Sequence, residues 1–240
     1  MRSGCSVTRA DREMLDIHQW VILLLIAAFV AQDTTAGPQL LVSEPLVAGP
    51  AVGWIAGDVN LGLDIGIAAQ LIWSGAVPAG SVLFLDVNTA TVCAVVVAVS
   101  AGKTLLAMAL SLAWLIAVGF LGSALTVLNR RLNGRLIRGI RPESDRGRFI
   151  AMRHLTGWAV AGARGMITVA IGVPLGITVV SRLAPSVGPY VDPVLLWSGI
   201  LGAGAGVAIG ATWRYGRGKA ALLGALGVLG LWMVYIRPDR

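Results

Sequence analysis

Three aspartates in apolar surroundings are the residues of this 240-residue chain whose chemistry stands out first. Asp58, Asp64 and Asp86 lie in a region, residues 13–102, that contains neither lysine nor arginine. An ionisable side chain at the centre of a bilayer costs about 2.5–3.5 kcal/mol, so such residues need water or a polar partner. The simple alternative is that these carboxylates lie at hydrated loop ends. The functional interpretation is a water-accessible cavity whose carboxylates bind a hydroxyl-rich solute.

An amide and an indole lie in the same region. Gln70 is in the middle of the apolar segment AAQLIWSG, where an amide must find hydrogen-bond partners. Trp73 follows three residues later, on the same face of a helix, and could stack on a sugar ring. An ordinary tryptophan at the membrane interface is the competing interpretation. We therefore expect Gln70, Asp86, Asp58, Trp73 and Asp64 to be the substrate-binding residues.

Other kinds of chemistry find little support. Gly102-Lys103-Thr104 resembles the end of a phosphate-binding loop, but Val97 occupies the position where that motif needs glycine. The two histidines, His18 and His154, lie in different polar segments and do not suggest a metal site. An intramembrane aspartyl protease would need two membrane aspartates and has no other support. We expect no catalytic residue, metal ion or cofactor in this chain.

The composition sets the fold class. Hydrophobic residues make up 56% of the chain and charged residues 13%, with a mean hydropathy of +0.80. A soluble domain has about a quarter charged residues. We predict an all-α polytopic membrane protein with a single domain over residues 1–240. The 31 glycines suit close packing of transmembrane helices.

The net charge of +7 is unevenly distributed. A polar flank occupies residues 1–16, and eight arginines lie in one hydrophilic segment, residues 129–154. By the positive-inside rule this segment is a basic cytoplasmic loop. It contains a single aromatic residue, Phe149, whereas nucleic-acid binding would need a folded basic surface with stacking aromatics. We expect no nucleic-acid partner.

The apolar runs differ in length and continuity. Residues 38–57, 61–79 and 87–101 are each short or interrupted by proline, glycine or an acid. A full span needs about 20 apolar residues, so these three predict discontinuous or re-entrant helices. Spans are predicted at residues 17–31, which is slightly short, and at 104–128, 155–180 and 193–213. Residues 220–236 are flanked by basic clusters at both ends, so this segment either is re-entrant or places one cluster outside.

One motif resembles a known family. The segment from Glu44-Pro-Leu-Val-Ala-Gly-Pro50 through Gly57-Asp58 and Gln70-Leu-Ile-Trp73 to Asp86 is similar to the N-terminal signature of the mannose/fructose/sorbose-type phosphotransferase system (PTS) membrane subunit IIC. Glycines at positions 53, 62, 66 and 75 occur at nearly the same spacing. Weaker similarity, including Ala163-Arg164 and the ending Val234-Tyr-Ile-Arg-Pro238, extends over essentially the whole chain.

The resemblance implies a function and a set of partners. It implies a permease component that binds and moves a hexose-like sugar inward and is not itself an enzyme. A IID membrane subunit and soluble IIA and IIB phosphoproteins would be its partners, with IIB phosphorylating the sugar. The resemblance further implies a multi-pass location in a bacterial cell membrane and a homo-oligomer of the IIC–IID pair.

Two positions depart from the family pattern. Glu44 replaces the usual arginine, and Phe84-Leu85 replaces two prolines before Asp86. Either change could alter the substrate. The alternative function is therefore a divergent permease or receptor-like relative that is uncoupled from phosphorylation.

Overall fold

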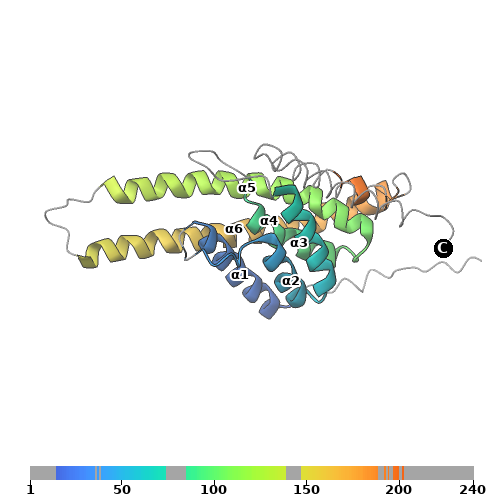
Figure 1. Cartoon of the computed structure of the whole chain (residues 1–240), viewed down its shortest axis with the longest axis horizontal. Helices are drawn as coiled ribbons and strands as arrows, with labels where there is room; N and C mark the ends of the chain where they lie inside the picture. The colour runs from blue at the N-terminus through green and yellow to red at the C-terminus, as the bar shows by residue number, and fades with distance from the viewer. Residues whose placement is uncertain are drawn as a thin grey trace, which may run out of the picture.

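The computed structural model describes residues 15–35, 37, 39–73, 85–138 and 147–188, together with 192, 194, 197–199 and 202. Most of the polar flank, most of the predicted span at 193–213 and all of that at 220–236 lie outside the described residues. The described part is helical, without strands (Figure 1). Its helices are α1 (Ile17–Thr35), α2 (Pro45–Ala56), α3 (Val59–Trp73), α4 (Val87–Ser100), α5 (Leu105–Arg138) and α6 (Gly147–Val187).

Three helices, α1, α5 and α6, are long and apolar enough to cross a membrane. They contain 19, 34 and 41 residues. At a rise of 1.5 Å per residue, α1 matches the roughly 30 Å hydrocarbon layer, while α5 is about 51 Å long and exceeds it. The all-helical membrane fold predicted from composition is confirmed.

The other three helices are too short to cross. α2, α3 and α4 contain 12, 15 and 14 residues, which gives lengths of about 18–23 Å. They correspond to the three short or interrupted apolar runs of the sequence, so the expected short segments are confirmed. Pro45 begins α2, and Gly57, at φ +92°, ends it in the left-handed conformation that glycine adopts without strain.

α2 and α3 form a hairpin whose backbones touch. A Cβ atom at Gly49 would lie 2.4 Å from the carbonyl oxygen of Gly62, and one at Gly62 would lie 2.4 Å from that of Gly49. A Cβ atom at Gly53 would lie 2.9 Å from the Gly62 Cα, and one at Gly66 would lie 2.5 Å from the carbonyl oxygen of Pro45. The glycines of the sequence motif thus lie where α2 and α3 contact each other, and larger residues do not fit at these positions.

α4 is the central helix of the bundle. Eleven of its fourteen residues are buried, and it packs against α1, α2, α3, α5 and α6. Short and β-branched side chains such as Val92, Val95 and Val96 fill the space around it. This apolar core fixes where the first residues of α4 lie relative to the long helices.

α5 and α6 run side by side and extend beyond the four shorter helices (Figure 1). The basic segment predicted as a loop over residues 129–154 is partly helical, because α5 continues to Arg138 and α6 begins at Gly147. Arginine and leucine have high helix propensity, so the hydrophilic composition does not end either helix. Residues 139–146 lie outside the described part.

Candidate functional site

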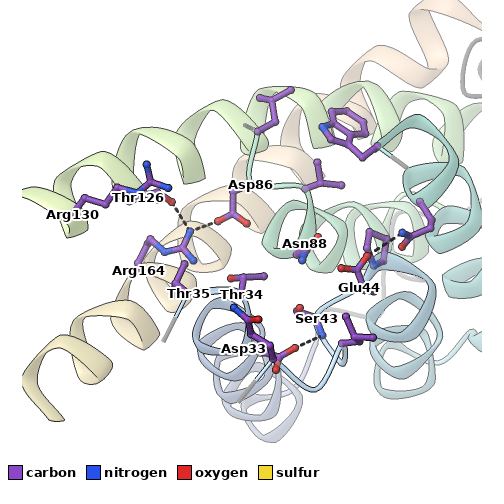
Figure 2. Close-up of a pocket in the computed structure, with 17 residues that line it drawn as sticks. Asp33, Thr34, Thr35, Ser43, Glu44, Asp86, Asn88, Thr126, Arg130 and Arg164 are labelled. Atoms are coloured by element: carbon purple, nitrogen blue, oxygen red, sulfur yellow. Dashed lines mark hydrogen bonds and ion pairs between the residues drawn. The ribbon is translucent and has the colours of Figure 1, made fainter. Parts of the chain in front are cut away.

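A cavity of about 400 Å³ lies where the ends of α1–α4 meet α5 and α6 (Figure 2). Its wall combines carboxylates, amides, hydroxyls and two guanidinium groups with a few apolar side chains. The lining residues are Asp33, Thr34, Thr35, Gln39, Leu41, Ser43, Glu44, Pro45, Gln70, Trp73, Leu85, Asp86, Val87, Asn88, Thr126, Arg130 and Arg164.

Asp86 caps the N-terminus of α4. Its Oδ1 accepts a hydrogen bond from the backbone N–H of Thr89 at 3.3 Å, the usual way an aspartate satisfies the first turn of a helix. The backbone N–H of Asp86 donates to the Ser123 hydroxyl of α5 at 3.1 Å. The carboxylate is therefore placed by helix capping and by α5 together.

Arg164 of α6 neutralises that carboxylate. Its Nη1 donates to Asp86 Oδ2 and to the Thr126 hydroxyl, the latter at 2.7 Å (Figure 2). Its Nη2 donates to the Ala31 carbonyl at 3.2 Å. The basic partner of Asp86 thus lies outside residues 13–102, the region that contains neither lysine nor arginine. Packing of α4 against α6 supplies the cation from 78 positions further along the chain.

Asp33, at the end of α1, is a cavity residue that sequence reasoning missed. It is 3% exposed, and its two carboxylate oxygens accept backbone hydrogen bonds from Leu40 at 2.6 Å and Ser43 at 3.1 Å. These bonds hold the connection between α1 and α2, in which Gln39 and Leu41 have positive φ angles of 54° and 62°. An acid at the end of an apolar run, just before Gly37, was the signal available in the sequence.

Gln70 and Glu44 face each other across the α2–α3 hairpin. Gln70 Nε2 donates to Glu44 Oε2 at 2.9 Å, and Gln70 Oε1 accepts a longer bond from the backbone N–H of Leu46 at 3.4 Å. Trp73, one turn after Gln70, lines the same cavity. The structure thus brings Gln70, Trp73 and Asp86 together.

The remaining two predicted residues lie outside this wall. Asp58 accepts from the backbone N–H of Leu61 at 3.0 Å and pairs with Lys103 Nζ at 3.8 Å, so it too has a cationic partner. Asp64 is exposed on α3. Neither residue lines the cavity. Asp58 caps the N-terminus of α3, and Asp64 is a polar residue on the surface of that helix.

Hydroxyls and one further amide were also missed. Thr34, Thr35 and Thr126 donate to backbone carbonyls of their own helices, which leaves their oxygen lone pairs as acceptors. Asn88, the second residue of α4, lines the cavity together with Arg130 of α5. The wall therefore offers both donors and acceptors, the combination that hydroxyl groups need.

Known families provide the remaining comparison. A family model described as "PTS system sorbose-specific IIC component" matches residues 17–211. The chain belongs to this family. The mannose-type PTS IIC family suggested by the motif between Glu44 and Asp86 is thereby confirmed, and the chain is a sugar-specific IIC component of the phosphotransferase system.

A solved structure titled "Structure of membrane protein" has the same fold. It aligns with a TM-score of 0.68 and 19% identity over 93% of this chain and 96% of that chain. At this identity the likeness supports the IIC fold alone. No curated protein sequence matches the chain.

Proposed function

We propose that this IIC chain binds a hexose-like sugar in the cavity between α1–α4 and the α5–α6 pair and moves it inward. A IID membrane subunit would be its partner in a bacterial cell membrane, and the IIC–IID pair would assemble into a homo-oligomer. Soluble IIA and IIB proteins would deliver the phosphoryl group to the sugar. Gln70, Trp73 and Asp86, with Asn88 and Glu44, would form the binding wall, whereas Asp58 and Asp64 would stabilise the surrounding helices.

The observation that carries this proposal is the chemistry of the cavity wall. Its volume of about 400 Å³ falls within the range of roughly 300–1,000 Å³ typical of small-molecule sites. Gln70 and Asn88 contribute amides, Asp86 and Glu44 contribute acceptors, and Trp73 offers an aromatic surface. A sugar hydroxyl donates and accepts at once, so it can satisfy such a mixed wall better than an apolar solute could.

The position of the cavity along α5 supports inward delivery. Thr126 and Arg130 line the cavity, and Arg130 begins the basic part of the same helix. The positive-inside rule assigns the basic end of α5 to the cytoplasm. A sugar in this cavity would therefore lie near the face where a soluble phosphoprotein operates.

Direct sugar binding to the chain, purified with its IID partner, tests the proposal. Asn88→Leu removes an amide from the wall without touching the Asp86–Arg164 pair, and we expect it to weaken binding about tenfold because sugar hydroxyls lose a partner. Asp58→Asn is the matched control outside the cavity and should bind like wild type. Equal sugar affinity in all three proteins would remove the cavity assignment.

Coupling to phosphorylation needs a separate assay. Membrane vesicles containing the IIC–IID pair should phosphorylate sugar from phosphoenolpyruvate only when the soluble PTS proteins are added. Sugar uptake that continues unchanged, without product phosphate, would instead favour the uncoupled permease.

A further inference from the structure

The three carboxylates of the cavity wall differ in how their charge is balanced. Asp86 is paired with Arg164, and Asp33 accepts two backbone hydrogen bonds and is buried. Glu44 accepts a hydrogen bond only from the neutral amide of Gln70, and among the described residues it has no cationic partner. Neither Asp33 nor Glu44 has a cationic partner among the described residues, but Asp33 is buried and both of its oxygens accept from backbone N–H groups, whereas Glu44 is half-buried and accepts from a single side-chain amide.

Helix capping does not account for Glu44. The residue occupies the N-cap position of α2, with φ −61° and ψ 138°, yet its side chain makes no capping hydrogen bond. An aspartate or serine would make that bond readily. Interaction with the helix dipole stabilises a negative charge there only weakly. The Glu44 carboxylate instead accepts a hydrogen bond from the Gln70 amide at 2.9 Å.

The cations of the cavity lie at its other end. Arg164 is occupied by Asp86, and Arg130 lies on α5, on the opposite side of the cavity from Glu44 in Figure 2. The cavity is therefore polarised, with guanidinium groups beside α5 and α6 and a free carboxylate beside α2 and α3. A ligand that fits this wall has its positive group at the Glu44 end.

The neighbours of Glu44 suit an ammonium group. Trp73, also in the wall, has an aromatic ring of the kind that attracts cations. Gln70 is oriented by Glu44, because a carboxylate can only accept and so receives the NH₂ side of the amide. An ammonium donates three hydrogen bonds and accepts none, so a carboxylate and an aromatic face match it.

We propose that Glu44 makes this site selective for an amino sugar with a free, protonated amine. The proposal rests on the sugar-binding function proposed above and adds the substrate class. The ammonium binds at the Glu44 carboxylate beside Trp73, and the ring hydroxyls bind the amides and Asp86. No covalent step is involved.

Three matched ligands test the selectivity: a hexose, the corresponding 2-amino-2-deoxyhexose and its N-acetyl derivative. Each is titrated onto the chain purified with its membrane partner. We expect the wild type to bind the free amine about ten- to a hundredfold more tightly than the other two, the range for hydrogen bonds to charged groups. The N-acetyl derivative lacks the positive charge of the amine, so the comparison tests the charge without a change of pH.

Glu44→Gln is the decisive variant, since it keeps the size and the hydrogen-bonding capacity of the side chain. We expect the ratio of the amine affinity to the hexose affinity to fall to about one, while the hexose affinity itself also falls because Glu44 is part of the wall. Asp58→Asn, which removes a carboxylate outside the cavity, should keep the full preference.

The outcomes separate the two proposals. Hexose binding with no amine preference, or a preference that survives Glu44→Gln, overturns the role of Glu44 and leaves the sugar-binding function standing. Failure of all three sugars to bind overturns both.

Discussion

Asp86 and Arg164 form an ion pair that joins the first residue before α4 to the middle of α6, with side-chain exposures of 8% and 4%. The same guanidinium also contacts Thr126 of α5 and the Ala31 carbonyl of α1. One arginine thus links four helices at the wall of the cavity. The geometry of this wall depends on a charge balance that extends over distant parts of the chain.

Removing Arg164 should therefore destabilise the protein strongly. Arg164→Gln leaves Asp86 charged and buried without its partner, which we expect to cost about 3–5 kcal/mol. Thermal unfolding of the purified protein in detergent measures the change. The double variant Asp86→Asn/Arg164→Gln carries no buried charge and should recover much of the loss. A single variant as stable as wild type would show that the pair contributes little.

Glycine contacts in the α2–α3 hairpin should tolerate no methyl group. Gly49→Ala places a Cβ atom 2.4 Å from the backbone oxygen of Gly62, and backbone cannot move aside as a flexible side chain can. We expect a loss of about 1–3 kcal/mol, typical of overpacking. Gly134→Ala on α5 is the matched control, because nothing lies within 4 Å of its Cβ position. There alanine should be neutral or stabilise the helix by up to about 1 kcal/mol. Equal stability of the two variants would contradict the close contact.

Asp33 should control the order of the connection between α1 and α2. Asp33→Asn can offer only one acceptor oxygen to the two backbone N–H groups of Leu40 and Ser43. We expect a loss of about 1.5–3 kcal/mol locally and faster hydrogen exchange at those two amides. Asp64→Asn, at an exposed carboxylate of α3, provides the control and should leave both exchange rates unchanged. Unaltered protection in Asp33→Asn would argue against this anchoring.

The two ends of α5 should label from opposite sides of the membrane. In a Cys5→Ser background, Arg135→Cys should resist an impermeant thiol reagent on intact cells and react after permeabilisation, because the basic end is cytoplasmic. Lys103→Cys, before the start of α5, should react from outside in intact cells. The buried Cys93 should stay unlabelled in both. Labelling of position 135 from outside would reverse the orientation.

Local composition predicted more of the fold than of the site. Prolines and glycines in the runs at 38–57 and 61–79, and the length of only 15 residues at 87–101, predicted that all three would form short helices, because these features act on their own segment. The partner of Asp86 could not be predicted in this way, since Arg164 is brought to it only by the packing of α4 against α6. Gln70 stood out because a single amide in apolar surroundings is a local signal.

Asp33 shows the opposite case. Asp33 accepts hydrogen bonds from backbone N–H groups in the connection between α1 and α2. Gln39 and Leu41 have positive φ angles in this connection, and neither residue type predicts such angles from the sequence. Hydrogen bonds to backbone groups cannot be predicted from the amino-acid composition. Only the folded chain reveals that this carboxylate is part of the cavity wall.

The short helices also change the thickness of the membrane barrier. Lys103, just before α5, donates to the Gly57 carbonyl at 3.3 Å, so the tip of the α2–α3 hairpin and the α4–α5 turn lie at one face. From there to the cavity the chain provides only the 14 residues of α4, or about 21 Å of packed helix. The surrounding hydrocarbon is about 30 Å thick. The packed helix between the cavity and this face is therefore about a third shorter than the hydrocarbon layer of a bilayer is thick.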